Sequence, residues 1–190
     1  MALYPGKEKS PGKQTARNWV YAKSSVNLPK RFLSGTHVVI SSRECGDIHH
    51  LMEGYGIKKS NIIACDLDKV ARQEAWKLGV RLSPYPDIVD TFKWAIDLRG
   101  KEDIASVNVD LCGNVKSGAP IVQRVLQLAD EDTDVFYTFV RGRDEGMYST
   151  EDRIQYLSEY LSYPITRNDY MSYQSSTDTS RGAPMCAVIL

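Results

Sequence analysis

The chain has 190 residues, of which 42% are hydrophobic and 25% are charged, and its 24 acidic and 24 basic side chains give a formal net charge of zero. This length and composition predict one domain with a single core. No apolar run reaches the roughly 18 residues that a membrane-spanning helix needs, and the N-terminus lacks the apolar stretch of a signal peptide, so we expect a cytoplasmic protein.

The basic side chains are concentrated near the N-terminus. Residues 1–31 contain one acidic residue, Glu8, and these basic ones: Lys7, Lys9, Lys13, Arg17, Lys23, Lys30 and Arg31. A basic arm of this kind can contact the phosphates of a nucleic acid, and it can equally be a solvated leader. The first dozen residues hold two prolines and two glycines, so we expect a flexible leader over residues 1–13 and a single domain over residues 14–190.

Residues 36–67 form the stretch around which the fold is predicted to be built. The apolar runs 36–40 and 61–65 are typical of buried strands, and a tight turn with a short helix over about 47–54 separates them. This order is typical of a βαβ unit with parallel strands, whose carboxyl ends meet at one edge of the sheet. Open α/β sheets bind ligands at that edge, where the strand order reverses. The residues expected to face it are Glu44, Gly46 and Asp66.

The rest of the chain continues the alternation of helices and strands. The expected elements are a helix over 14–25, a helix from the N-cap Asp68 to Gly79, a strand over 80–82, a helix over 87–98, a strand over 104–111, a helix over 120–129, a strand over 134–140, a helix over 150–161, and strands over 170–174 and 185–190. The last two strands have no helix between them, so they must be antiparallel neighbours. We therefore predict an α/β Rossmann-like three-layer sandwich whose seven-stranded, mostly parallel sheet ends in an antiparallel hairpin.

Five βα units followed by a hairpin resemble the class I S-adenosylmethionine-dependent methyltransferases, and local motifs agree. The turn E-C-G resembles the start of that family's acidic-x-Gly-x-Gly-x-Gly motif, and I-I-A-C-D resembles its second strand, which ends in a carboxylate. The segment P-D-I-V-D and the run D-L-C-G-N resemble the sites after the third and fourth strands. The segments R-E-C-G-D, D-L-C-G and F-V-R-G-R-D-E resemble segments of small methyltransferase-like proteins of bacteriophages. This resemblance would place the chain in a host cytoplasm.

The resemblance implies S-adenosylmethionine as cofactor and gives roles to individual residues. Asp66 would hold the ribose hydroxyls, although it could instead cap the helix that follows. Glu44 would lie near the methionine end or cap the helix that begins near Asp47, and the turn should need Gly46 in either case. Asp87 would contact the adenine amine.

The fourth strand should lie beside the first, which brings two polar residues to the same crevice. Asp110 and Asn114 would orient the nucleophile of the methyl acceptor, and Asp110 could alternatively tie down the loop through backbone amides. The charge cluster of Arg141, Arg143, Asp144 and Glu145 is more typical of a solvated loop than of a substrate clamp.

Several potential metal ligands are expected near the same edge of the sheet: Cys45, His49, His50, Cys65 and Cys112. Zinc sites usually show closely paired ligands such as C-x-x-C, and the sequence has none, so we expect no metal. The four cysteines, at 45, 65, 112 and 186, have no regular spacing and are expected to be reduced thiols.

Two functions from different classes remain open at this point. The first is methyl transfer from S-adenosylmethionine to an unidentified acceptor, with a nucleic acid or nucleotide favoured by the basic arm. The second is a non-catalytic Rossmann-like module that binds nucleic acid or protein. Ile48 and His50 stand where the family has its second and third glycines, which favours the module, whereas Glu44 and Asp66 favour the enzyme.

Overall fold

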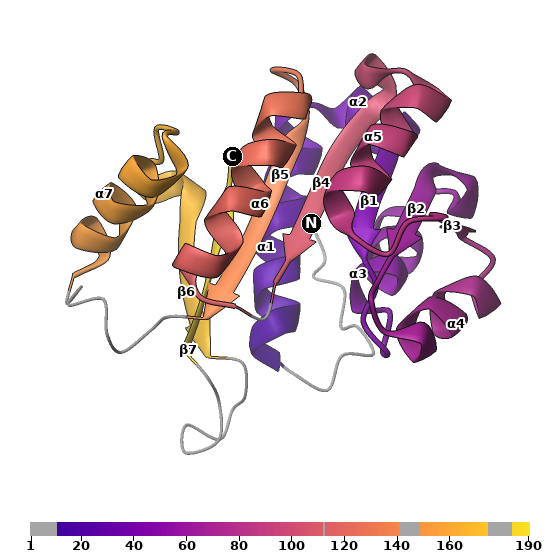
Figure 1. Cartoon of the computed structure of the whole chain (residues 1–190), viewed down its shortest axis with the longest axis horizontal. Coiled ribbons are helices and arrows are strands. Elements are labelled where there is room, and N and C mark those ends of the chain that lie inside the picture. Colours follow the sequence, from indigo (N-terminus) through magenta and orange to yellow (C-terminus); the bar gives the residue numbers. More distant parts are fainter. Residues whose placement is uncertain (1–10, 112, 141–148, 175–183) are drawn as a thin grey trace.

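The computed structural model describes residues 11–111, 113–140, 149–174 and 184–190, which form one seven-stranded sheet between two layers of helices (Figure 1). The strands are β1 (Thr36–Ile40), β2 (Ile62–Cys65), β3 (Arg81–Leu82), β4 (Ile104–Asp110), β5 (Asp134–Val140), β6 (Tyr170–Gln174) and β7 (Pro184–Ile189). The helices are α1 (Pro11–Asn27), α2 (Pro29–Ser34), α3 (Gly46–His49), α4 (Lys69–Lys77), α5 (Ile88–Arg99), α6 (Val115–Leu128) and α7 (Thr150–Leu161). A π-helical turn, His50–Gly54, continues α3.

The sheet has the strand order β3-β2-β1-β4-β5-β7-β6. Strands β1 to β5 are parallel, and β7 is antiparallel to both of its neighbours, β5 and β6. The order reverses at β1, because β2 lies on one side of it and β4 on the other. This confirms the predicted fold class, including the antiparallel end strands and the neighbouring positions of the first and fourth strands.

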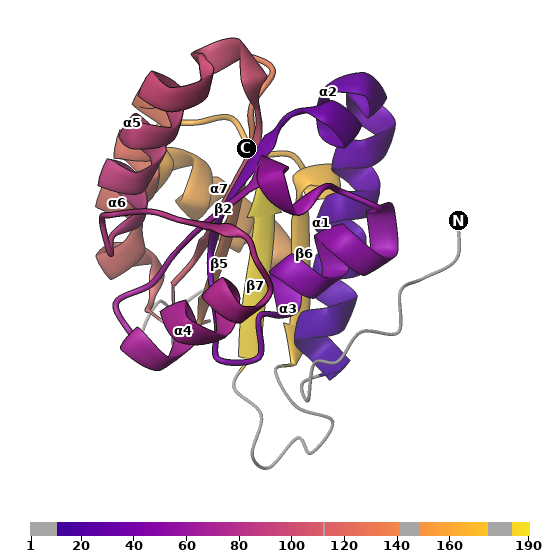
Figure 2. The same ribbon diagram turned by 90° about the vertical axis from the view of Figure 1, so that its right-hand side faces the viewer.

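Helices cover both faces of the sheet, so each strand contributes alternate side chains to two cores (Figure 2). Val38 packs in the core under α5, α6 and α7, whereas Val39 packs in the core under α1, α2 and α3. In β5, Tyr137 and Phe136 divide in the same way. Full burial on both faces explains why the central strands read as nearly continuous apolar runs.

The N-terminal helix is longer than the sequence predicts. The described part of helix α1 already includes residues 11–13, which belong to the segment expected to be a flexible leader. It ends at Asn27, two residues beyond the predicted end at residue 25. Pro29 then opens α2, a helix of six residues that the sequence analysis missed. Residues 1–10 lie outside the described part.

One further helix start differs from prediction. Helix α6 begins at Val115 and not at Pro120, because the Asn114 side chain accepts the N–H of Ser117 and caps the helix five residues earlier. Helix α7 has the predicted bounds, but its cap is Ser149, which forms a full capping box with Asp152.

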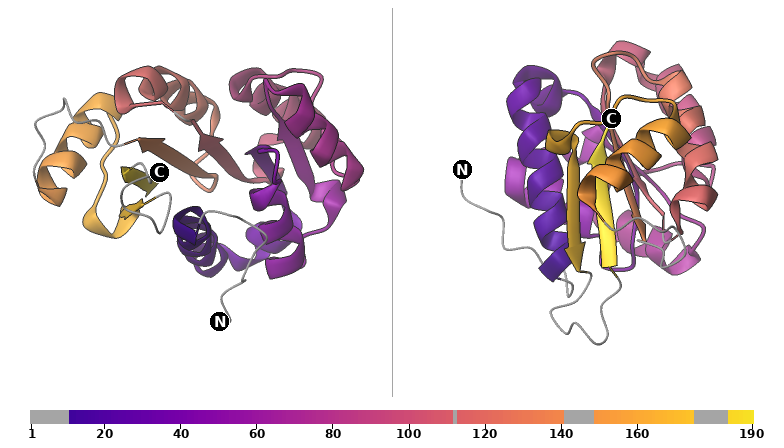
Figure 3. Two further views of the ribbon diagram at one scale, coloured as in Figure 1. Left: turned by 90° about the horizontal axis from the view of Figure 1, so that it is seen from below. Right: turned by 90° about the vertical axis from the view of Figure 1, so that its left-hand side faces the viewer.

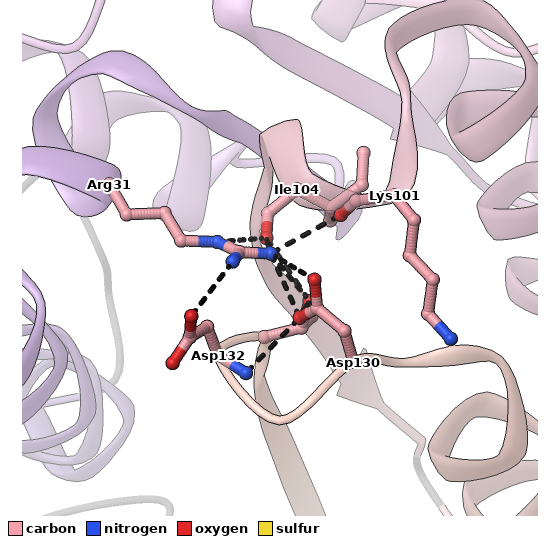
Figure 4. A network of polar contacts seen from close by, with 6 residues as sticks. Arg31, Lys101, Ile104, Asp130 and Asp132 are labelled. Carbon is pink, nitrogen blue, oxygen red and sulfur yellow. Dashed lines mark hydrogen bonds and ion pairs between the residues drawn. The ribbon is translucent and has the colours of Figure 1, made fainter.

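Arg31 ties α2 to the end of the sheet at which β4 begins (Figure 4). Its Nε and Nη2 donate to the carbonyl oxygen of Ile104 at 3.0 and 2.8 Å, and Nη2 also donates to both carboxylate oxygens of Asp130 at 2.9 and 2.8 Å. Asp132 completes the group with an ion pair of 3.5 Å. The side chain of Arg31 is only 16% exposed, so these contacts are largely shielded from water.

We expect Arg31→Met to lower the free energy of unfolding by about 2 kcal/mol, because a partly buried carbonyl and carboxylate lose their charged donor. Urea unfolding with an unchanged m-value measures the loss. Lys30→Met, an exposed cation on the same helix, is the matched control and should cost less than about 0.5 kcal/mol. Equal effects of the two substitutions would contradict a structural role for the Arg31 contacts.

Candidate functional site

A cavity of about 610 Å³ opens where the central strands end. Its walls come from the carboxyl ends of β1, β2 and β4, from the start of α5 with the segment before it, from two residues of α6, and from one residue each of α1 and α4. The polar lining residues include Ser41, Ser42, Arg43, Asp66, Asp68, Asp87, Asp110, Arg124 and Lys13. Figure 3, left, looks toward this edge of the sheet, with α1 on one side of the strands and α5 and α6 on the other. The volume lies within the range of small-molecule sites, and the position is the point where the strand order reverses.

Asp66 lies in this cavity at the end of β2, as the sequence predicted. One of its carboxylate oxygens accepts the N–H of Asp68 at 2.8 Å. The helix cap, the alternative role considered for Asp66, is instead Asp68, whose side chain accepts the N–H of Val70 at 2.8 Å. Burial raises the pKa of the Asp66 carboxyl above its ordinary value, while the Asp68 N–H opposes that rise. Ribose binding by Asp66 stays a prediction.

Asp87 also lines the cavity, and it has a structural task as well. It caps α5, because its Oδ1 accepts the N–H of Asp90 at 2.9 Å. A contact from Asp87 to a ligand would therefore use its other carboxylate oxygen. The predicted adenine contact stays a prediction.

The two residues predicted to orient an acceptor separate in the structure. Asp110 lines the cavity at the end of β4, where the Thr138 hydroxyl donates to its Oδ1 and Lys13 of α1 forms an ion pair of 3.5 Å with its Oδ2. Asn114 caps α6 and is not among the cavity residues. The contacts that fix Asp110 thus include side chains of β5 and α1, neither of which the loop-tying interpretation considered.

Glu44 and Gly46 are not among the cavity residues, although the loop that contains Glu44 supplies Ser41, Ser42 and Arg43. Gly46 is the first residue of α3 and has no positive φ, and the left-handed residue of the turn is Cys45, with φ of 50° and ψ of 36°. The expectation that the turn needs Gly46 stays a prediction. The methionine-end role of Glu44 stays a prediction.

Two features of the site were missed by the sequence analysis. Arg43 and Arg124 bring positive charge to a cavity that is otherwise rich in carboxylates, and the Arg43 Nε lies 2.6 Å from Asp68 Oδ2. Asp47, read only as the start of a helix, forms a buried ion pair with Arg17 of α1, with Nε and Oδ2 2.9 Å apart. The pattern R-E-C-G-D gives no sign that its last carboxylate pairs with α1 and is not among the residues that line the cavity.

The histidines and cysteines considered as metal ligands are dispersed. His49 pairs with Glu53 at 2.7 Å, and His50 is buried against α1, where its Nδ1 lies 3.1 Å from Gln14 Nε2. Within the described residues, no group of three His, Cys, Asp or Glu side chains could hold a metal ion. Cys45, Cys65 and Cys186 are free thiols, as predicted. Cys112 and the charge cluster at 141–145 lie outside the described residues.

Most of the basic arm is engaged within the chain. Ion pairs join Lys13 to Asp110, Arg17 to Asp47, Lys23 to Asp169, and Arg31 to Asp130 and Asp132. These carboxylates compensate four of the five arm cations that the structure describes, Lys30 being the fifth. Lys7 and Lys9 lie outside the described part.

No helix within the described ranges is long and apolar enough to cross a membrane.

No protein-family profile matches this sequence, and no curated protein matches it. Among solved structures, a protein of the NADB-Rossmann superfamily from Streptococcus agalactiae is 13% identical, with 97% of this chain and 69% of that chain covered and a TM-score of 0.51. An antibiotic-related methyltransferase is 11% identical, with 87% and 93% covered and a TM-score of 0.50. Likeness at these identities shows the Rossmann-like α/β fold alone.

Proposed function

We propose that this chain transfers a methyl group from S-adenosylmethionine, bound in the cavity at the carboxyl ends of β1, β2 and β4. The observation that carries the proposal is the placement of Asp66, Asp87 and Asp110 around one cavity of about 610 Å³ at the reversal of strand order. Apolar side chains beside them, including Leu67, Ile88, Val89 and Leu111, suit a purine ring. A nucleoside needs a carboxylate that accepts hydrogen bonds from its ribose hydroxyls, and an apolar wall for its base.

The strand order favours this cofactor over a nicotinamide dinucleotide. Dinucleotide-binding Rossmann sheets have the order 3-2-1-4-5-6, whereas here an antiparallel β7 is inserted between β5 and β6. The first βα turn, E-C-G-D-I-H-H, also lacks the glycines that let a backbone approach a pyrophosphate. S-Adenosylmethionine has a ribose and an adenine but no pyrophosphate. The antibiotic-related methyltransferase that shares the fold agrees with this choice.

The bound cofactor would supply an activated methyl group, and the residues of this chain would supply position. Asp66 would accept hydrogen bonds from the ribose hydroxyls through the oxygen that does not bind the Asp68 N–H. Asp87 would accept from the adenine amine. Asp110, held by Thr138 and Lys13, would accept a hydrogen bond from the N–H or O–H of the acceptor and so align its lone pair with the methyl group.

We expect Asp66→Asn to weaken binding of S-adenosylhomocysteine by about 2 kcal/mol, or roughly thirty-fold, in isothermal titration calorimetry. Asparagine keeps an oxygen for the Asp68 N–H but loses the charge that the ribose hydroxyls would meet. Adenosine should show the same loss, and 2′,3′-dideoxyadenosine should not, because it has no hydroxyls to donate.

The matched control is Asp97→Asn, which changes an exposed carboxylate on α5 and should leave binding unchanged. Unchanged affinity in folded Asp66→Asn would remove Asp66 from the ribose site. If neither S-adenosylmethionine nor S-adenosylhomocysteine binds the unaltered protein, the non-catalytic module becomes the better proposal. NADH belongs in the same titration, because its binding would point to a dinucleotide site.

The acceptor is the least constrained part of this proposal. The nucleic acid suggested by the basic arm is not favoured, since Lys13, Arg17, Lys23 and Arg31 are paired with carboxylates of the same chain. An acceptor with an N–H or O–H group suits Asp110 better than an anionic one. The bacteriophage source and the cytoplasmic location stay predictions.

A further inference from the structure

The loop that joins β1 to α3 forms one wall of the cavity and contains no glycine before Gly46. Its residues Ser41, Ser42 and Arg43 line the cavity, and Cys45 at its end is held in the left-handed conformation that residues with a side chain rarely adopt. The N–H and the thiol of Cys45 both point to the carbonyl oxygen of Ser42, at 3.0 and 3.4 Å. A turn with this unfavourable backbone conformation persists only where contacts with the surrounding structure hold it in place.

Asp47, whose side chain is 5% exposed, anchors the end of this loop to the rest of the protein. One carboxylate oxygen lies 2.9 Å from Nε of Arg17, and the other accepts from the Tyr21 hydroxyl at 3.1 Å and from the Asn108 amide at 2.8 Å. Arg17 and Tyr21 are four residues apart and so share one face of α1, while Asn108 belongs to β4. Asp47 therefore joins the loop to both α1 and the centre of the sheet.

The same face of α1 covers the two positions at which methyltransferases of this class carry glycine. Ile48 and His50 are both buried there, and the His50 ring stacks on Tyr21 with centroids 5.3 Å apart. Bulky side chains at these positions keep the loop backbone from packing in the way a glycine-rich loop would. The shape of the loop must then be set by the contacts between α3 and α1.

We propose that Arg17 is a positioning residue for the cofactor cavity: through its buried ion pair with Asp47 it holds the loop 41–47 in the shape that forms the cavity wall. The expected effect of Arg17 on cofactor affinity rests on the proposed function. The effect of Arg17 on the shape of the loop does not. We call this ion pair between Arg17 of α1 and Asp47 the loop clamp. In this chain the loop clamp replaces a glycine-rich turn in setting the shape of the loop. Helix α1 thereby contributes to the binding site through Arg17, although Arg17 does not itself contact the ligand.

The closure of the loop can be measured without any ligand, through Cys45. This thiol is 3% exposed, and burial raises its pKa to about 11, so alkylation at neutral pH should be slow while the loop is closed. N-ethylmaleimide labelling followed by peptide mass spectrometry reads Cys45 separately from Cys186, which is fully buried in β7. Cys186 thus reports global unfolding in the same sample.

We expect Arg17→Met to raise the labelling rate of Cys45 at least ten-fold relative to that of Cys186, and Arg17→Lys to restore most of the protection. Lys23→Met, which removes another α1 cation paired far from the loop, is the matched control and should change neither rate. Tyr21→Phe removes one hydrogen bond to Asp47 and should give a smaller rise of the same kind, which keeps the test valid if Arg17→Met does not fold.

A second arm titrates the same variants with S-adenosylhomocysteine, and we expect at least ten-fold weaker binding for Arg17→Met with recovery in Arg17→Lys. A rate at Cys45 that stays unchanged, or rises only together with Cys186, overturns the clamp. A selective rise at Cys45 with unchanged affinity overturns its role in binding. If the unaltered protein binds no S-adenosylhomocysteine while Cys45 responds as expected, the proposed function fails and the loop clamp stands.

Discussion

Replacing Asp47 with alanine is expected to lower the free energy of unfolding by about 3–5 kcal/mol, because it leaves the Arg17 guanidinium buried without its carboxylate. The Tyr21 hydroxyl and the Asn108 amide lose their acceptor at the same time. Urea unfolding followed by circular dichroism measures the loss, with the m-value as a check on two-state behaviour.

Two comparisons make this result specific to a buried pair. Glu74→Ala breaks the exposed Glu74–Lys77 pair on α4 and should cost about 0.5 kcal/mol or less. The double variant Arg17→Met with Asp47→Leu removes both charges and should recover much of the stability, since apolar replacement of a buried pair is often close to neutral. A loss below about 1 kcal/mol for Asp47→Ala would mean that water reaches the pair.

The strands were predictable because their signal is local. The runs 36–40 and 134–140 have the predicted bounds, since a strand buried on both faces needs a continuous apolar sequence. The run 170–174 also has the predicted bounds, although it forms an edge strand that is mostly not buried. The position of the cavity at the carboxyl edge of the sheet was predictable from the topology, because parallel strands end at the same edge. Asp66 and Asp110 therefore reached the same cavity as expected.

The errors concern features that local patterns do not encode. Helix α2 has six residues, too few to show a helical period. Pro120 suggested a helix start, but a side-chain cap at Asn114 begins α6 earlier. Nothing in the local pattern marks Cys45 as the left-handed residue of its turn, because glycine is the residue that usually adopts that conformation.

The ion pairs of the basic arm are another feature that local sequence patterns do not encode. Its excess of lysine and arginine is real, but a count of charges cannot show which carboxylates lie opposite them after folding. Arg31 and Asp130 are 99 residues apart in the sequence, and Lys23 and Asp169 are 146 apart. In the described part of the arm, four of the five cations pair with carboxylates of the same chain.

Acid is expected to destabilise this fold through His37, by about 3 kcal/mol between pH 7 and pH 4. His37 is fully buried in β1, where its Nε2 lies 2.8 Å from the Phe32 carbonyl oxygen and its Nδ1 lies 2.8 Å from the Ser106 hydroxyl. The carbonyl can only accept, so Nε2 carries the proton of the neutral ring and Nδ1 accepts from Ser106. Burial lowers the pKa of His37 to about 4, against about 6.5 in the unfolded chain.

The direction follows from proton binding. Between these two pKa values the unfolded chain binds a proton that the folded chain does not, so stability falls as the pH drops from about 6.5 to about 4 and no further below. Other groups titrate in this range, including His50, whose pKa burial also lowers to about 4, so the effect of His37 must be isolated. His37→Gln keeps a donor and an acceptor but cannot be protonated.

The measurement is urea unfolding of the two proteins at pH 7 and at pH 4. The unaltered protein should lose about 3 kcal/mol more than His37→Gln over this interval, whatever the two stabilities are at pH 7. His50, present in both proteins, cancels from the difference. Equal losses in the two proteins would mean that His37 is protonated in the folded state as readily as in the unfolded chain, and that the contact between α2 and β1 is open to water.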